Sequence, residues 1–342
     1  MVREDFITLH SKHLLGVSMS LWKLKITMYS TLALIIGLTT LIFLALLNAM
    51  GVTLGLLPLI AIVILFNLIQ WLVAPYIIEA LYNVREADPI RYSWLHEIVD
   101  KLSRKSGLKK PKVMIADMPI PNAFAYGSPL TGSRVAVTRG LLATLSRDEI
   151  EAVIGHELGH VAHKDMTVMV LVSLLPAILY YIGYSLMYVP SRRDEDEGGN
   201  LAVIGILLLL ASFILNLFVL GLSRLREYYA DRHSASIVSY GARKLQLALA
   251  KIVQATDRIV RSGYVDLGRY KSFRALFISD PSRAFSEARA LSYYRRDYML
   301  VERLKRRKLT TLDLIEELFS THPNIVKRLK ALDQVAAELG QA

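Results

Sequence analysis

The stretch that decides the fold is His156-Glu157-Leu158-Gly159-His160, which lies within a predicted helix from Asp148 to Asp165. Residues four apart lie on one face of a helix, so His156 and His160 can reach the same ion. Glu157 follows the first of them and can take a proton from a zinc-bound water. Such a short pattern also occurs by chance on surface helices, so the rest of the chain has to support this interpretation.

The residues before this stretch predict a small sheet and a well-marked helix start. Three short segments, separated by Gly and Pro, indicate strands at residues 111–116, 121–125 and 134–138. Ser146 is placed to cap the helix, and Glu149 three residues later completes a capping-box pattern. A small sheet is therefore expected to precede the motif helix.

The composition indicates a membrane protein. Of the 342 residues, 53% are hydrophobic and the mean hydropathy is +0.37, which is too apolar for an ordinary soluble protein. The chain has no Cys, which excludes disulfides, thiolate metal sites and Cys nucleophiles. The net charge of +11 is first an orientation signal in a membrane protein, so we expect no nucleic-acid partner.

Four apolar runs of spanning length predict two membrane hairpins. The runs cover residues 26–47, 54–74, 166–189 and 201–222. They divide the chain into an N-terminal segment, a first transmembrane hairpin, a subdomain with the sheet and the motif helix, a second hairpin, and a helical C-terminal part. The bounds of these parts are 1–25, 26–75, 76–165, 166–222 and 223–342.

The distribution of positive charge predicts the topology. Segments 1–25, 76–165 and 223–342 carry 4, 12 and 23 Lys and Arg residues, whereas the two connecting turns carry none and 2. Positively charged flanks stay on the cytoplasmic side of a membrane. We therefore expect a multi-pass protein of the cell membrane with both termini and the motif helix in the cytoplasm.

The second hairpin suggests a third metal ligand. Because a helical hairpin returns the chain to the side it left, Glu227 should come back beside His160 and complete a site of two His and one Glu, with water in the fourth position. Asp231, one helical turn further on, is placed to accept the other ring N–H of a ligand His. The alternative for Glu227 is an ion pair with Arg224.

At this point the sequence resembles the HtpX-type membrane zinc metalloproteases, which are relatives of the CAAX prenyl proteases. The resemblance covers about residues 20 to 335. Four motifs carry it, in this order: Pro121-Asn122-Ala123-Phe124-Ala125, His156-Glu157-Leu158-Gly159-His160, Ser223-Arg224 through Glu227-Tyr228-Tyr229-Ala230-Asp231, and Ser320-Thr321-His322-Pro323 followed by Arg328.

The resemblance implies a mainly α-helical membrane protein. It would have four transmembrane helices and a cytoplasmic, gluzincin-like α+β zinc protease domain with a small sheet. One zinc ion per chain would support endopeptidase cleavage of misfolded or damaged membrane proteins at the cytoplasmic face, a protein quality-control activity. Its partners would be unfolded or membrane-protein substrates and the lipid bilayer, and a homo-oligomer is compatible with it.

The resemblance also implies roles for individual residues. His156, His160 and Glu227 would hold the metal, with Glu157 as the catalytic base. The strand of Asn122, Ala123 and Phe124 resembles an edge strand that pairs with the substrate backbone. His322 either contacts the oxyanion or substrate, or caps the C-terminal helix. Arg328 is expected to pair with Asp231 or another buried acid.

Two segments depart from the family pattern. Residues 1–20 extend ahead of the first predicted span, and the link at residues 282–317 is longer than usual. This link contains the basic cluster Arg303 to Lys308, which we interpret as a solvated face in preference to a partner or lipid-headgroup contact. The role of both segments stays open.

Other function classes fit less well. A CAAX-type prenyl protease would generally have more spans, and a zinc-dependent membrane scaffold without catalysis would have no use for Glu157. A channel or transporter would need ionisable residues in its spans, and these are almost absent. The sequence does not identify natural substrates, cleavage preference, oligomeric state or trigger.

Overall fold

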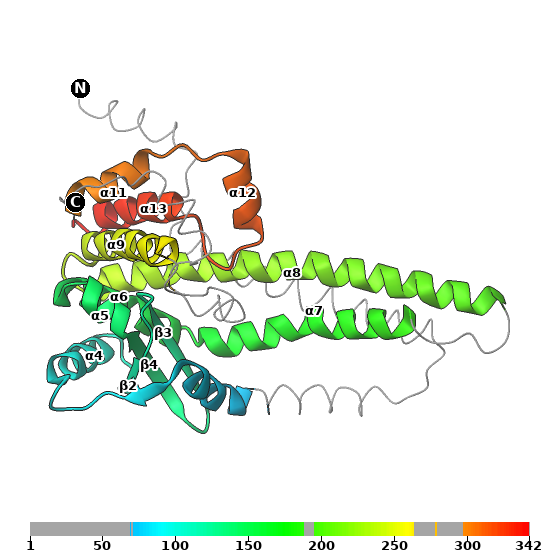
Figure 1. The fold of residues 1–342 in the computed structure, drawn as a ribbon, viewed down its shortest axis with the longest axis horizontal. Coiled ribbons are helices and arrows are strands. Elements are labelled where there is room, and N and C mark those ends of the chain that lie inside the picture. The colour runs from blue at the N-terminus through cyan, green and yellow to red at the C-terminus, as the bar shows by residue number, and fades with distance from the viewer. Residues whose placement is uncertain (1–68, 70, 188–194, 263–277, 279–296, 342) are drawn as a thin grey trace, which may run out of the picture.

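The computed structural model of the protein describes residues 69, 71–187, 195–262, 278 and 297–341. The predicted N-terminal segment and the first predicted span lie outside the described residues, as does most of the second span. Within the described part, the chain forms a catalytic end built of a small sheet and several helices, and a long helical hairpin that extends from it (Figure 1).

The sheet has four strands, β1 (Val84–Glu86), β2 (Lys112–Ala116), β3 (Ala123–Ser128) and β4 (Gly132–Thr138), in the order β1-β2-β4-β3. Strands β2 and β4 are parallel, and the other two pairs are antiparallel. The three predicted strands are present, although β3 begins two residues later and runs three residues further than predicted. The short β1 was not predicted, because three residues carry no periodic signal.

Helix α4 (Ser93–Lys105) lies between β1 and β2 in the chain, and α5 (Arg139–Thr144) and α6 (Arg147–Ala162) follow β4. Helix α6 carries the His-Glu-Leu-Gly-His motif. Its first turn is closed by the predicted capping box, in which Ser146 Oγ accepts the Glu149 N–H and the Glu149 carboxylate accepts the Ser146 N–H. The helix start is therefore fixed by local sequence alone.

The end of the motif helix differs from the prediction. Helix α6 ends at Ala162, and Asp165 begins the next helix, α7 (Asp165–Met187), so the expected continuous helix to Asp165 is wrong. Lys164 between them has a φ of 53°, in the left-handed region, and the two helix axes differ by 56°. This bend turns Asp165 back toward the motif.

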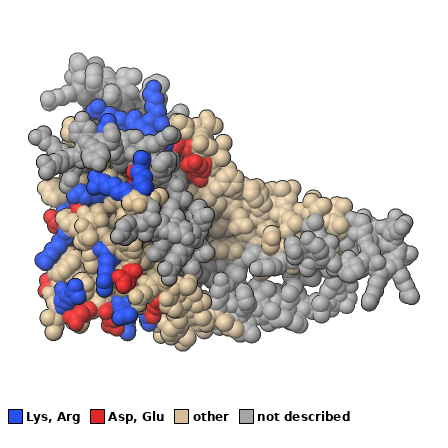
Figure 2. Space-filling view, viewed as in Figure 1, with Lys and Arg blue, Asp and Glu red and all other residues tan. Residues whose placement is uncertain are grey.

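Helices α7 and α8 (Glu195–Ile237) form the second predicted hairpin. Its residues Ala202–Ile237 form one helix that is long and apolar enough to cross a membrane. Helices α6 and α7, which are bent against each other, meet the same criteria of length and hydropathy only if they are counted as one span. These are the candidate spans among the described residues. Figure 2 shows the described charged side chains gathered at the catalytic end, whereas the described part of the hairpin shows none on this face.

Helix α8 continues without a break from the predicted span into the catalytic end, where the C-terminal helices of the described part pack against it or against one another. These are α9 (Gly241–Arg261), α11 (Asp297–Arg306), α12 (Thr311–Leu318) and α13 (Ile325–Glu338). Leucines and alanines from α9 and α13 join those of α6 in the main hydrophobic core. A rigid helix thus connects the membrane part with the site.

The basic cluster Arg303 to Lys308 is only partly a solvated face. Lys305 is 2.6 Å from a carboxylate oxygen of Asp333 on α13, and Arg307 pairs with Asp313 on α12. The side chains of Lys305 and Arg307 are only 15% and 16% exposed. Lys305 near the end of α11 and Arg307 just beyond it thus turn inward, where acids from other helices neutralise them, whereas Arg303, Arg306 and Lys308 stay exposed.

Candidate metal centre

Helices α6 and α8 cross closely at the motif because two of its residues are glycines. A Cβ at Gly159 would lie 2.9 Å from Ala230 Cα on α8, and a Cβ at Gly155 would lie 3.0 Å from Ser234 Oγ. Ser234 Oγ also donates a hydrogen bond of 2.6 Å to the Ala152 carbonyl oxygen. The four-residue spacing of the glycines therefore brings α8 against the face of α6 that carries the histidines.

The crossing places the three predicted ligands together. His156 and His160 on α6 and Glu227 on α8 each offer a ligand atom, and these atoms all lie within 4.8 Å of one another. The Nε2 atoms of the two imidazoles are 3.2 Å apart. Each lies near one carboxylate oxygen of Glu227, at 3.6 Å for His156 and 3.5 Å for His160.

His156 is held by an acid and an arginine from the C-terminal half. Its Nδ1 lies 2.9 Å from Asp231 Oδ1, and Arg328 donates to both oxygens of Asp231 at 2.7 Å. The Nδ1–H donated to Asp231 leaves Nε2 as the acceptor atom that faces Glu227. The structure thus places Asp231 and Arg328 where the sequence predicted them.

His160 is held in the same way by residues that sequence reasoning did not select. Its Nδ1 lies 2.7 Å from Asp165 Oδ2, and Arg226 Nη2 lies 2.9 Å from that same oxygen. Asp165 and Arg226 are 4% and 6% exposed. In the sequence, these two residues were marked only by their positions. Asp165 is an acid at the start of one apolar run, and Arg226 directly precedes Glu227 after the next run.

The charge states of the donors suit a divalent metal. Burial lowers the pKa of both His156 and His160 to about 4, so both imidazoles are neutral at neutral pH. Burial alone would raise the pKa of Glu227, but His322 and Arg328 outweigh it and hold that pKa well below its usual range. Two neutral imidazoles and one ionised carboxylate form a donor set that zinc prefers, so the residues fit this metal.

Glu157 lies beside the three ligands in a different electrostatic setting. Its Oε2 accepts a hydrogen bond of 2.8 Å from the Ala125 N–H on β3, and its side chain is buried. Burial and the charge of Glu227 raise the pKa of Glu157 well above its usual value. A carboxylate with a raised pKa binds a proton more readily, which is the property required of a general base.

His322 lies at the centre rather than at a helix end. Its Nδ1 is 3.2 Å from Glu227 Oε2, and the side chain is buried. The residue that caps α13 is Asn324, whose side chain accepts the Val326 N–H at 2.9 Å. The cap alternative for His322 is therefore wrong.

The predicted substrate strand is an edge strand among the described residues, but its side chains are occupied. Asn122 Oδ1 accepts the Ile278 N–H at 2.9 Å, and Arg328 donates to the Ile278 carbonyl oxygen at 2.7 Å. Ala123 and Phe124 are 1% and 3% exposed, with Phe124 packed in a second hydrophobic cluster. Only the outward backbone of β3 is in a position to pair with a peptide.

Comparisons with known proteins agree on one family. The sequence pattern of Peptidase family M48 matches residues 89–336. A "Protease HtpX homolog" of Aeropyrum pernix is 43% identical over 279 residues, which cover 80% of this chain and 84% of the relative. A protein of the same description from Thermoplasma acidophilum is 38% identical over 307 residues, which cover 85% of this chain and 90% of the relative.

A solved structure shares the fold. The crystal structure of Ste24p from S. mikatae aligns with a TM-score of 0.51 and covers 91% of this chain and 67% of that chain, at 18% identity. At this identity the likeness concerns the fold alone. Since the family pattern spans the motif helix, α8 and α13, and the relatives match most of the chain, the protein belongs to peptidase family M48 as an HtpX-type membrane metalloprotease.

Proposed function

We propose that the protein is a zinc-dependent endopeptidase with one zinc ion per chain, held by His156, His160 and Glu227. It hydrolyses peptide bonds of misfolded or damaged membrane proteins at the cytoplasmic face, as part of protein quality control. The observation that carries this proposal is the convergence of these three donors beside a buried Glu157 of raised pKa. A binding site without catalysis would not need that carboxylate.

The chain's own residues account for the proton transfers. Zinc, when bound, supplies Lewis-acid polarisation of the reacting oxygen atoms. Glu157 takes a proton from the attacking water at its carboxylate and returns it to the leaving amine nitrogen. His322, 3.2 Å from Glu227, lies close enough to the metal ligands to donate to the oxyanion of the tetrahedral intermediate.

The backbone of β3 supplies the peptide clamp in this proposal. The Ala125 N–H points away from β4 and bonds to Glu157 Oε2, so it belongs to the outer edge of the sheet. An extended substrate added to this edge takes over that N–H and releases the carboxylate. The substrate contacts predicted for Asn122, Ala123 and Phe124 are therefore assigned to the backbone of this strand. The side-chain oxygen of Asn122 accepts the Ile278 N–H instead.

The proposed topology has four spans, with both termini and the site on the cytoplasmic side. It is supported by the positive charge of residues 76–165 and 223–342, which flank the hairpin of α7 and α8. Glu227 lies five residues beyond the end of the predicted span at Leu222, on the order of 8 Å at 1.5 Å per residue. The zinc site would therefore lie just outside the hydrocarbon, where water and unfolded segments can reach it.

The proposal is tested with purified full-length protein in detergent, incubated with an unfolded membrane protein. We expect cleavage that stops with a chelator and returns with added zinc. A farnesylated peptide with a C-terminal CAAX sequence serves as the second substrate. Cleavage of that peptide alone would replace the proposed specificity with that of a prenyl protease, and no cleavage of either substrate with zinc bound would support a scaffold.

A further inference from the structure

Helix α12 turns its acids toward the protein and its apolar side chains outward. Asp313 and Glu317, one helical turn apart, are only 3% and 7% exposed. The large apolar side chains of α12 and its C-cap are 43% to 63% exposed, and this outer face of α12 comprises Leu312, Leu314, Ile315, Leu318 and Phe319. A helix packed against a core in water has the opposite arrangement, because burial of apolar surface drives folding.

The inward acids are fully engaged, so the orientation of α12 is fixed. The Asp313 carboxylate accepts the Thr310 N–H at 2.8 Å and pairs with Arg307. The Glu317 carboxylate accepts the Asn324 N–H at 3.2 Å and pairs with Lys327 on α13. Rotating α12 to bury its apolar side chains would break the pairs of Asp313 with Arg307 and of Glu317 with Lys327, and separating the partners of a buried ion pair is strongly destabilising.

The outer face of α12 is continuous with the apolar surface of α8. The ring of Phe319 lies 6.3 Å from that of Phe213 on α8, measured between centroids. Phe213 is itself 51% exposed and lies nine residues before Leu222, where the predicted span ends. The Phe319 ring therefore contacts the part of α8 that the predicted span contains.

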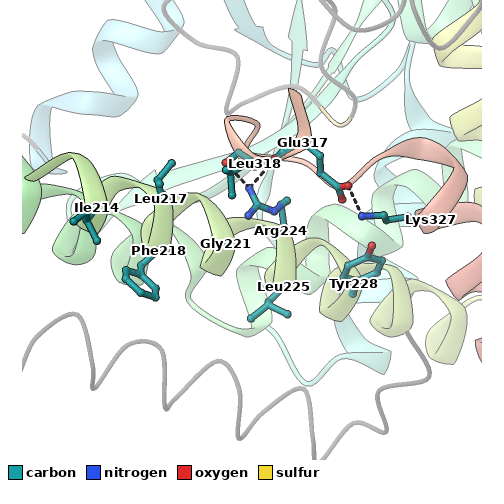
Figure 3. Close-up of a pocket in the computed structure, with 10 residues that line it drawn as sticks. All are labelled: Ile214, Leu217, Phe218, Gly221, Arg224, Leu225, Tyr228, Glu317, Leu318 and Lys327. Atoms are coloured by element: carbon teal, nitrogen blue, oxygen red, sulfur yellow. Dashed lines mark hydrogen bonds and ion pairs between the residues drawn. The ribbon is translucent and has the colours of Figure 1, made fainter. Parts of the chain in front are cut away.

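The space between α12 and α8 is lined by apolar side chains at one end and by charged side chains at the other. A cavity of about 580 Å³ separates Leu318 from Ile214 and Phe218 on α8, with Arg224, Glu317 and Lys327 at its polar end (Figure 3). Helix α12 lies across the axis of α8 in Figure 1, and therefore parallel to the plane of a membrane that α8 crosses. Apolar and charged groups are thus ordered along the membrane normal, as at the boundary between acyl chains and headgroups.

We propose that α12 is an interfacial membrane helix. Its outer face inserts into the acyl-chain boundary of the leaflet next to the catalytic end, and lipid also fills the cavity between α12 and α8. Lipid is the occupant because Phe319 on the outer face of α12 contacts Phe213 on the exposed apolar surface of α8, the helix long and apolar enough to cross a membrane. This inference concerns the bilayer and does not depend on the reaction.

The contact reaches the metal centre through the end of α12. Arg224 Nη1 on α8 donates to the carbonyl oxygens of Glu317, Leu318 and Ser320 at 2.9, 3.2 and 2.8 Å. His322 follows Ser320 by two residues. Arg224 thus holds the short segment that joins the end of α12 to His322, the residue beside Glu227.

A single spin label tests the proposal, because the chain has no Cys of its own. Ile315→Cys carries the label on the outer face of α12, and Met299→Cys on α11 is the matched control, with exposures of 51% and 50% before substitution. The labelled full-length protein is placed in phosphatidylcholine nanodiscs. Relaxation of each label is measured with oxygen, which concentrates in lipid, and with a water-soluble nickel chelate.

We expect the ratio of the oxygen response to the nickel response to be at least tenfold higher for the Ile315→Cys label than for the Met299→Cys label. Leu312→Cys gives a second outer-face label if the first variant does not yield folded protein. A nickel response equal to the control would place α12 in water. Protection from both reagents would mean that protein, such as another part of this chain or a second copy, covers the face. Either result overturns the proposal.

Discussion

His160 Nδ1 lies 2.7 Å from Asp165 Oδ2, and this contact joins the motif helix to the first residue of the membrane hairpin. Arg226 on the returning helix reaches the same oxygen at 2.9 Å, directly before the third ligand, Glu227. The base of the hairpin therefore holds both helices that carry ligands. We therefore expect the hairpin to orient the proposed metal site as well as to anchor the protein.

Asp165→Asn should weaken zinc binding by roughly 10–100-fold, as is usual when the acid that orients a ligand His is lost. The neutral amide no longer enforces the Nδ1–H form of His160. Zinc affinity of the full-length variant is measured by competition with a chromophoric chelator. Asp148→Asn is the matched control, because Asp148 lies at the exposed start of α6, the helix that carries His160. Equal affinity in both variants would remove Asp165 from the site.

Glu157→Gln should keep zinc and the fold but abolish proteolysis, because the three ligands are unchanged while the base is lost. Zinc content, gel filtration and cleavage of an unfolded protein are measured on the same preparation. Retained cleavage above a few per cent of wild type would contradict the assignment of Glu157 as the base.

Glu227→Ala should lose both zinc and activity, because two imidazoles alone hold zinc weakly. Asp231→Ala should bind zinc roughly 10–100-fold more weakly and keep some activity, since it leaves the three ligands in place and removes the shared partner of His156 and Arg328. Metal analysis after gel filtration separates the two effects. Full zinc occupancy in Glu227→Ala would show that another residue is the third ligand.

The packing of α11 against α13 should depend on pH through Asp333. Burial alone would raise its pKa, but hydrogen bonds from Lys305 and Gln246 outweigh burial and lower the pKa below 3.8. A carboxyl group whose pKa is lower in the folded protein than its usual 3.8 stabilises the protein above pH 3.8. This stabilisation is lost as the pH falls through the pKa of the folded state. Asp333→Asn should therefore cost about 1 kcal/mol at pH 7, because the group is partly exposed.

The difference between Asp333→Asn and wild type should shrink as the pH falls below 3.8. Thermal unfolding of both proteins in detergent at several pH values measures this directly. A difference that stays constant over the whole range would show that packing, and not the charge of Asp333, stabilises α11.

The topology is tested with cysteine labels, since the native chain contributes no background. Gly198→Cys, in the first turn of α8 and between the two apolar runs, should react with an impermeant reagent only from outside the cell. Ser262→Cys, just after α9, should react only from the cytoplasm. Labelling of both positions from the same side would overturn the four-span topology.

Local sequence was sufficient for several features of the fold and site. The capping box at Ser146 and the four-residue spacing of His156 and His160 depend on contacts within one helical turn. Glu227 could be paired with them because a hairpin has to return to its starting side. These features follow from periodicity and connectivity, which are readable along the chain.

Other features required the tertiary structure. The hydrogen bond between Asn122 and Ile278 joins residues 156 apart in the chain, and Asp165, which the bend at Lys164 turns toward His160, is contacted by Arg226 from the returning helix. The orientation of α12 is of the same kind, since its pattern of leucines and acids fits either rotation. Sequence alone determined which residues share a helix face; packing decided which face turns toward the protein, because only packing supplies partners for buried charge.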